Sequence, residues 1–383
     1  MREVFITNHH VISSLGFGSA SNFKNVVAQN TGIKKHKREN GQSYYSSLID
    51  KKRIDIEFSK IGNTADYTIL EKMMILSVSY LLKESDYQIS KRSGLIISTT
   101  KGNIDLLAID SQFKGHSNRV YLSELGKQIQ NYFGFKNEAI VISNACVSGI
   151  FAVSVADRLI KSEMYDDVII VSGDLVSEFI LSGFTSFQAI SDQPCKPFSK
   201  NRTGITIGEA IASALVSYDK GTNNAVQIIG SGSCNDANHI SGPSRTGEGL
   251  FLSVQSAMKE ANVVVEDIDY ISAHGTATNF NDEMESIAFS RLNMLNIPLN
   301  SLKGFYGHTL GASGLLETII GMESLFHNTL IASKGFDKLG VSHPINVIKK
   351  NEKKELSVFL KTASGFGGSN TAVIFKKVKK ILT

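Results

Sequence analysis

The central stretch of the chain reads Val141-Ile142-Ser143-Asn144-Ala145-Cys146-Val147-Ser148-Gly149-Ile150. Its β-branched start predicts a strand, its small residues predict a tight turn, and a helix follows whose apolar residues share one face: Phe151, Val155, Leu159 and Ile160. A cysteine in such a turn lies at the positive end of a helix dipole, where unpaired backbone N–H groups favour a thiolate. Because the thiolate is the nucleophilic form, Cys146 is a candidate nucleophile. The alternative is a buried structural cysteine, since free cysteines are among the most buried residues.

Length and composition indicate a globular protein with a large core and two or more domain-sized units. The chain has 383 residues, of which 42% are hydrophobic and 20% are charged. It contains no uninterrupted apolar run of about 18 residues, so we expect no membrane span, and its first residues lack the regions of a signal peptide. The three cysteines have no metal-ligand spacing, so we expect no metal site, and a reducing cytoplasm is the simplest setting. The net charge of +4 is too small to argue for nucleic acid.

Strands and helices alternate along the first half of the chain. We expect buried strands over residues 3–12, 94–100, 139–143, 167–173 and 211–217, with helices over 65–84 and 121–133. Such alternation predicts a largely parallel α/β sheet with helices on both faces. The polar segment 34–60 is expected to be a solvated loop.

The same layout restarts in the second half. Strands are expected over residues 226–230, 268–273, 356–360 and 371–375, helices over 247–261, 282–291 and 313–326, and a glycine-spaced loop over 303–311. This repetition predicts two similar halves, an N-terminal half over residues 1–222 and a C-terminal half over residues 223–383.

Four groups of reactive or glycine-rich residues follow strand ends or fill loops, where α/β proteins place their sites. They are Cys146, Ala273-His274-Gly275-Thr276-Ala277-Thr278, Lys303-Gly304-Phe305-Tyr306-Gly307-His308 and Gly365-Phe366-Gly367-Gly368-Ser369-Asn370. A lone histidine in a loop is usually structural. Two histidines flanked by glycines, with a lysine five residues before one of them, indicate a site.

Together these motifs resemble the β-ketoacyl-(acyl carrier protein) synthases of the thiolase superfamily. They stand in the family's order, with further matches at Gly311-Ala312-Ser313-Gly314 and weaker ones at Lys196-Pro197-Phe198, Asn201-Arg202, Gly208-Glu209, Asp236 and His239. The resemblance is to the elongating Cys-His-His branch, because the initiating branch has an asparagine in place of His308. It implies an α/β fold of the thiolase type, with two similar halves that each hold a mixed five-stranded sheet, in layers α-β-α-β-α.

The resemblance also implies a mechanism. Cys146 accepts an acyl group from a carrier-protein thioester. A malonyl thioester then loses carbon dioxide, and His274 and His308 donate ring N–H groups to the enolate oxygen. Lys303 orients the site electrostatically, and we expect Glu285 to be its ion-pair partner. The alternative for Lys303 and Glu285 is a purely structural bridge.

Several residues match substrate-binding positions of the family. Thr276, Thr278 and Ser241 match positions that bind the phosphopantetheine arm, and Phe366 matches a gate over the acyl pocket. The backbone N–H groups of Cys146 and Phe366 match the oxyanion hole. For the two threonines the alternative is turn chemistry. No cofactor is expected beyond the phosphopantetheine of the carrier protein.

The expected function is therefore a β-ketoacyl-ACP synthase that performs a decarboxylative Claisen condensation. Its partners would be an acyl carrier protein and a second subunit, in a homodimer or a heterodimer with a related synthase-like chain. The segment between residue 100 and Cys146 is shorter than is usual in the elongating members, so both fatty-acid synthesis and a specialised polyene, pigment or polyketide pathway stay open. Two other functions also stay open: a degradative thiolase, against which the lack of a cysteine in residues 364–370 argues, and a non-catalytic chain-length-determining subunit, against which the intact Cys146 argues.

Overall fold

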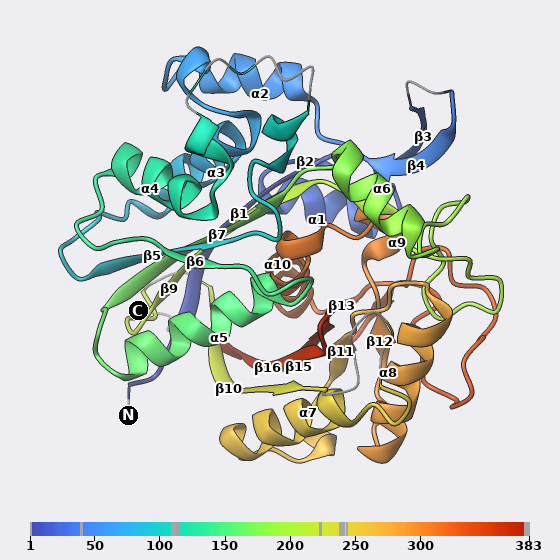
Figure 1. Cartoon of the computed structure of the whole chain (residues 1–383). Helices are drawn as coiled ribbons and strands as arrows, with labels where there is room; N and C mark the ends of the chain where they lie inside the picture. The colour runs from blue at the N-terminus through green and yellow to red at the C-terminus, as the bar shows by residue number, and fades with distance from the viewer. Residues whose placement is uncertain are drawn as a thin grey trace.

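Among the described residues, eleven strands form one continuous hydrogen-bonded sheet at the centre of the protein, and ten of them divide into two five-stranded sheets that join at one edge (Figure 1). The computed structural model describes residues 2–38, 41–108, 113, 115, 117–221, 224–236, 242 and 244–378. The first sheet has the order β1 (Phe5–Ser13), β9 (Ala210–Ser217), β7 (Asp167–Asp174), β5 (Ser93–Ser98) and β6 (Ile140–Ile142). The second has the order β10 (Ala225–Asn235), β16 (Ser369–Val378), β15 (Val358–Ser364), β11 (Tyr270–Ser272) and β12 (Leu299–Asn300).

The two sheets have the same topology. In the first sheet β9 pairs antiparallel with β1 and with β7, whereas the pairs β7–β5 and β5–β6 are parallel. In the second sheet β16 pairs antiparallel with β10 and with β15, whereas the pairs β15–β11 and β11–β12 are parallel. This confirms two similar halves with mixed five-stranded sheets. The expectation of a largely parallel sheet is wrong for the two antiparallel pairs of each sheet. In the second half the cause is local, because a tight turn of four residues joins β15 to β16 and permits only antiparallel pairing.

The sheets meet at their edges. Strand β1 pairs with β10 through Phe5 opposite Gln227 and Ile6 opposite Val226, so hydrogen bonds run continuously from one sheet into the other. The predicted boundary between residues 222 and 223 falls outside the described residues, between the last strand of the first sheet and the first strand of the second. That division into 1–222 and 223–383 stays a prediction.

Helices fill three layers around the sheets (Figure 1). The middle layer is α5 (Ser148–Lys161) and α10 (Ser313–Phe326), which contact each other and strands of both sheets. One outer layer is α2 (Lys51–Phe58), α3 (Ile69–Ser85) and α4 (Leu122–Phe133), and the other is α7 (Glu248–Ala261) and α8 (Asn279–Arg291). This is the expected α-β-α-β-α arrangement.

The shorter elements connect these layers. They are α1 (Ser19–Val27), α6 (Glu178–Ser186), α9 (Lys303–Tyr306), β2 (Gly16–Phe17), β3 (Ile33–Lys37), β4 (Ser43–Ser47), β8 (Ile207–Gly208), β13 (Thr329–Leu330), β14 (Glu352–Lys353), η1 (Thr64–Asp66), η2 (Ile104–Leu107), η3 (Ser117–Val120), η4 (Val265–Asp267) and η5 (Leu310–Ala312). No helix among the described residues is both long and apolar enough to cross a bilayer.

The polar segment 34–60 is not the solvated loop that its composition suggests. It forms the β3–β4 hairpin, which pairs with β8, and then helix α2. In α2 only Ile54 and Phe58 are buried, one turn apart, while charged side chains cover the other faces. Two apolar residues at helical spacing are too weak a periodic signal to predict a helix.

Helices α5 and α10 cross at their first turns, where glycines permit close contact. A Cβ atom on Gly149 would lie 2.7 Å from the Gly311 carbonyl oxygen, and one on Gly314 would lie 2.4 Å from the Ile150 nitrogen. The two helix starts therefore lie side by side. This contact brings the residues that precede each helix, Cys146 and His308, to the same place.

Gly314→Ala should lower the free energy of unfolding by about 1–3 kcal/mol, because the added methyl group overlaps the backbone of α5. The matched control is Gly183→Ala on α6, where an added Cβ meets nothing within 4 Å and alanine should be neutral or stabilising by up to ~1 kcal/mol. Urea unfolding of both variants measures the difference. Equal stability of the two variants would contradict the proposed contact.

Candidate active site

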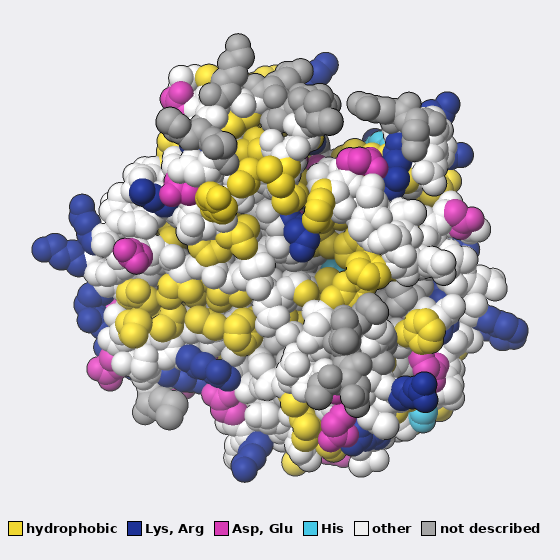
Figure 2. Space-filling model, viewed as in Figure 1, with side chains coloured by type: hydrophobic (Ala, Val, Ile, Leu, Met, Phe, Trp, Pro, Cys, Tyr) yellow, Lys and Arg dark blue, Asp and Glu magenta, His cyan; other side chains and the backbone are white. Residues whose placement is uncertain are grey.

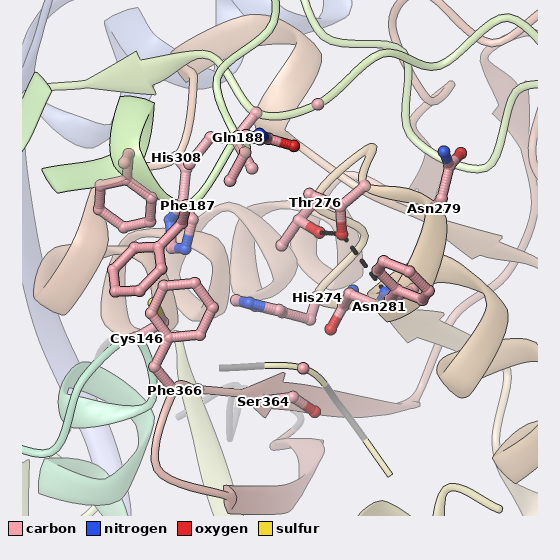
Figure 3. Close-up of a pocket in the computed structure, with 18 of the residues that line it drawn as sticks. Cys146, Phe187, Gln188, His274, Thr276, Asn279, Asn281, His308, Ser364 and Phe366 are labelled. Carbon is pink, nitrogen blue, oxygen red and sulfur yellow. Dashed lines mark hydrogen bonds between the residues drawn. The ribbon is translucent and has the colours of Figure 1, made fainter. Parts of the chain in front are cut away.

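Cys146, His274 and His308 converge in one buried site. Their side-chain ligand atoms all lie within 4.8 Å of one another, and the two imidazole rings are 5.2 Å apart at an angle of 83°. Cys146 lies between β6 and α5, His274 follows β11, and His308 precedes α10. Figure 3 shows both imidazoles pointing toward the side chain of Cys146. The structure thus brings together the three residues that the sequence analysis singles out as catalytic.

The turn before α5 that carries Cys146 is strained at the preceding residue, Ala145. Ala145 has φ = 44°, in the left-handed region, which costs on the order of 1–3 kcal/mol for a residue other than glycine. The hydroxyl of Ser148 holds this turn, because it donates to the Ala145 carbonyl oxygen at 2.6 Å and accepts from the Asn144 N–H at 2.8 Å. Gly365 packs on the opposite side, where an added Cβ would lie 3.1 Å from the Cys146 nitrogen.

The free thiol is protonated at neutral pH. Burial raises the pKa of the Cys146 thiol to about 11, although the Lys303 ammonium and the backbone N–H of Phe366 act in the opposite direction. The expectation of a thiolate preformed by the helix terminus is therefore wrong. Helix α5 begins only at Ser148, and just 8% of Cys146 is exposed to water.

Both histidines are neutral. Burial lowers the pKa of His274 and of His308 well below 6.5, and the nearby Lys303 ammonium lowers both further. The Leu310 N–H donates to His308 Nδ1 at 3.2 Å, and Lys303 Nζ lies 3.4 Å from His274 Nδ1. Because both of these partners are donors, each Nδ1 is an acceptor and the proton of each ring is on Nε2. We assign both rings as Nε2–H tautomers, which suits them to stabilise an anion.

Lys303 pairs with Glu317 and not with Glu285. Its Nζ lies 2.9 Å from Glu317 Oε1 and 2.5 Å from the His274 carbonyl oxygen. Glu285 instead accepts hydrogen bonds from the backbone N–H groups of His274 at 2.8 Å and Gly275 at 2.7 Å. The predicted Lys303–Glu285 ion pair is wrong, and Glu285 holds the His274 loop through its backbone. Spacing in the sequence could not separate the two carboxylates, but a glutamate surrounded by apolar residues in the helix 313–326 is a signal for a buried partner.

A cavity of about 370 Å³ opens from the catalytic residues toward the surface. Thr276 and Thr278 line it, and their hydroxyl oxygens are 2.9 Å apart. Thr278 also caps α8, because its hydroxyl accepts from the Asn281 N–H at 3.3 Å. Ser241, the third expected contact of the phosphopantetheine arm, lies outside the described residues, as does His239. Figure 3 shows Thr276 on the side of the cavity away from Cys146.

Aromatic side chains cover Cys146. The ring of Phe366 stacks on Phe184 with centroids 5.7 Å apart and meets the edge of Phe187 at 5.4 Å. Phe184 and Phe187 come from α6 and the residue that follows it, a segment for which the sequence analysis made no prediction. All three rings line the cavity, and Figure 3 shows Phe187 and Phe366 over the thiol. Access to Cys146 therefore depends on the position of these rings.

Comparison with known proteins identifies the family. The model named beta-ketoacyl synthase, N-terminal domain, matches residues 84–220, and the corresponding C-terminal domain matches residues 225–337. The 3-oxoacyl-[acyl-carrier-protein] synthase 2 of Vibrio cholerae is 26% identical over 98% of this chain and 99% of its own length. The protein of the same name from Rhizobium meliloti is 32% identical over 63% of this chain and 61% of its own.

Two solved structures have the same fold. The ishigamide ketosynthase/chain length factor has a TM-score of 0.89 and 22% identity, and the alignment covers 99% of this chain and 100% of that one. The structure of the Xenorhabdus doucetiae ketosynthase ApeO in complex with its chain length factor ApeC gives a TM-score of 0.87 and 23% identity. The alignment covers 98% of this chain and 98% of the matched chain. With the convergent Cys146, His274 and His308 and the paired domain matches, this chain belongs to the β-ketoacyl synthase family of the thiolase superfamily.

Proposed function

We propose that this protein is a β-ketoacyl-(acyl carrier protein) synthase, which condenses an acyl group held on Cys146 with a malonyl thioester. One observation carries the proposal: a buried thiol faces two neutral imidazoles that both present Nε2–H groups. Such a site can hold a thioester and can stabilise negative charge on an enolate oxygen. The substrates arrive on phosphopantetheine, and no other cofactor or metal takes part.

Acyl transfer comes first. The sulfur of Cys146 attacks the carbonyl carbon of the acyl thioester, the bond to the pantetheine sulfur breaks, and the thiol proton of Cys146 ends on the departing pantetheine thiol. The two Nε2–H groups stabilise the thiolate as it forms. The oxyanion of the tetrahedral intermediate accepts from the backbone N–H groups of Cys146 and Phe366, in agreement with the Phe366 N–H that already faces the thiol.

Decarboxylation and condensation follow. The bond between the malonyl carboxylate and Cα breaks, carbon dioxide leaves, and the electron pair moves to the thioester oxygen as an enolate. His274 and His308 donate to this oxygen through Nε2–H. The enolate carbon then attacks the acyl carbonyl on Cys146, the carbon–sulfur bond breaks, and the released Cys146 thiolate takes up a proton from water. The β-ketoacyl product stays on the carrier protein.

The intact site disfavours the alternatives. A chain-length-determining partner needs neither a thiol nor two oriented imidazoles, yet all three side chains are at most 8% exposed and are held by specific contacts. A thiolase needs a second cysteine, and Cys195 donates instead to the Lys303 carbonyl oxygen at 3.1 Å, beneath the site.

Condensation can be assayed directly with acyl-ACP and malonyl-ACP labelled with ¹³C in its free carboxylate, [3-¹³C]malonyl-ACP. The proposal expects release of labelled carbon dioxide and a β-ketoacyl-ACP two carbons longer than the acyl donor. Binding of acyl-ACP without carbon dioxide release would favour the non-catalytic subunit, and cleavage of β-ketoacyl-coenzyme A would favour the thiolase. Carrier proteins loaded with graded chain lengths would separate fatty-acid synthesis from a specialised polyene, pigment or polyketide pathway.

A second subunit is proposed to cover an apolar face beside the site. Phe151, Val155 and Leu159 lie half-buried along the outer side of α5, next to the edge strand β6. Figure 2 shows a band of hydrophobic side chains in the region where Figure 1 places α5. A second copy of this chain or a related synthase-like subunit fits this face, and ApeO has been solved in complex with a chain length factor.

The three free cysteines support the cytoplasm as the compartment.

The acyl carrier protein is proposed to dock on the β3–β4 hairpin. Its exposed Lys34, Lys35 and Lys37 are followed by Arg38, which pairs with Glu178 of α6 at 3.3 Å and so places this cluster beside the helix that lines the cavity. Carrier proteins are acidic, and exposed charges are screened within about 8 Å at physiological ionic strength. The KM for ACP-bound substrate should therefore rise with salt, while the KM for a small pantetheine thioester should stay constant.

Charge reversal tests this surface. Replacing Lys34, Lys35 and Lys37 by glutamate should reproduce the high-salt KM, whereas the same change at the exposed Lys349 and Lys350 should not. A KM that does not respond to salt, or equal use of coenzyme A thioesters, would exclude carrier docking there and leave the chemistry at Cys146 unaffected.

A further inference from the structure

A second lysine, Lys361, is buried beside the site in the middle of β15, and the mechanism above does not use it. Its side chain is 0% exposed. Its Nζ lies 2.7 Å from Glu317 Oε2 and 2.6, 3.1 and 3.4 Å from the carbonyl oxygens of Thr362, Ser272 and Ala273. All four neighbours are acceptors, so the nitrogen acts only as a donor, as an ammonium ion does.

These oxygens come from the three segments that carry the site. Ser272 and Ala273 directly precede His274 at the end of β11, and Thr362 lies four residues before Phe366. Glu317 lies on α10, nine residues after His308. One buried ammonium group therefore ties together the backbone segments from which both imidazoles and the covering Phe366 project.

Glu317 connects this ammonium group to the known members of the site. Its Oε1 binds Lys303, which in turn holds His274, and its Oε2 binds Lys361. Among the described residues Oε2 has no hydrogen-bond donor besides that ammonium. Two ammonium groups therefore share the Glu317 carboxylate beside two neutral imidazoles. Ammonium groups close to the site favour negative charge on an enolate.

We propose that Lys361 is a positioning residue that serves as a built-in monovalent cation, and that its oxygen cage is a latent site for K⁺ or NH₄⁺. Carbonyl oxygens arranged around a K⁺ ion can replace its hydration shell, and an ammonium group is a cation of the same charge that takes the same ligands. A side chain too short to reach the cage would open it to a free ion. This role of Lys361 in catalysis rests on the proposed function of the site.

Decarboxylation of malonyl-ACP by Lys361→Ala and Lys361→Met, in choline chloride, KCl or NH₄Cl, tests the proposal. In choline chloride kcat should fall about 100-fold for both variants, because small displacements of catalytic groups have effects of this size. KCl or NH₄Cl should raise the kcat of Lys361→Ala by roughly tenfold or more, and the rise should saturate with salt concentration. Neither salt should raise the kcat of Lys361→Met, because the methionine side chain fills the cage. The control is Lys377→Ala, since Lys377 also binds a carbonyl oxygen, that of Leu325 at 2.8 Å, but at the far end of α10. Its activity should match the wild type in every salt.

Thermal unfolding gives a readout that does not depend on activity. The measured quantity is the rise in Tm from choline chloride to KCl. This rise should be larger for Lys361→Ala than for the wild type or for Lys377→Ala. If the wild type fails to decarboxylate malonyl-ACP, the proposed function is wrong, and the Tm still decides whether the cage binds a cation. Wild-type kcat for Lys361→Ala in choline chloride, or a loss that no cation changes in either readout, would overturn the proposal. If Lys361→Ala does not fold in any of the three salts, Lys361→Met decides the question. A wild-type kcat in Lys361→Met would then overturn the proposal, and a kcat about 100-fold lower with normal acylation of Cys146 would support it.

Discussion

Cys146→Ala should abolish acyl transfer and condensation, with a loss on the order of a million-fold, as is typical when the nucleophile of a covalent mechanism is removed. The fold should be unaffected, because an alanine side chain fits within the space that the buried thiol occupies and no described side chain depends on its sulfur. Product formation from acyl-ACP and malonyl-ACP measures the loss, and circular dichroism measures the fold.

Cys234→Ala is the matched control, since Cys234 is half-exposed and lies on β10, outside the cavity. It should retain wild-type activity. Labelling by iodoacetamide alone does not discriminate, because the more exposed Cys234 can react first without any role in catalysis. Activity that survives the loss of Cys146 would overturn its assignment as the nucleophile.

His274→Ala and His308→Ala should each slow decarboxylation by on the order of 100- to 1000-fold, since each removes one Nε2–H donor to the enolate oxygen. Acylation of Cys146 should suffer less, because its oxyanion accepts from backbone N–H groups. The pKa of both imidazoles lies well below 6.5, so the wild-type rate should not fall through histidine protonation as the pH drops past 6.5.

His327→Ala provides the comparison for the two histidine variants. His327 is exposed at the end of α10, where its Nε2 lies 3.4 Å from Glu323 Oε2, and it should be dispensable. Release of labelled carbon dioxide from malonyl-ACP separates decarboxylation from acylation. A wild-type decarboxylation rate in His308→Ala would remove that residue from the enolate site.

The sequence predicts the catalytic site better than it predicts the surroundings of that site. Cys146, His274 and His308 follow or precede elements with clear periodicity, and a glycine adjoins each histidine, so their convergence could be inferred from motifs in the family's order. The ion-pair partner of Lys303 could not be inferred from the sequence. Glu285 lies on α8 and Glu317 on α10, both near the site, and only the folded arrangement of these helices around Lys303 decides which carboxylate reaches the ammonium.

Other differences have equally physical causes. The parallel sheet was expected from alternation of strands and helices, but a four-residue glycine turn reverses the chain between β15 and β16. The segment 34–60 is polar because its hairpin and helix lie on the surface, so composition alone indicates a loop. The thiolate was expected from a helix terminus, whereas burial dominates the pKa of Cys146.

Mass spectrometry of the intact protein after incubation with acyl-ACP tests the central claim most directly. The account predicts a mass increase of one acyl group per chain, mapped by peptide analysis to Cys146, and its loss on addition of malonyl-ACP as the β-ketoacyl product forms. An unmodified protein, or an acyl group on another residue, would contradict the assignment of Cys146 as the acyl carrier of a condensing enzyme.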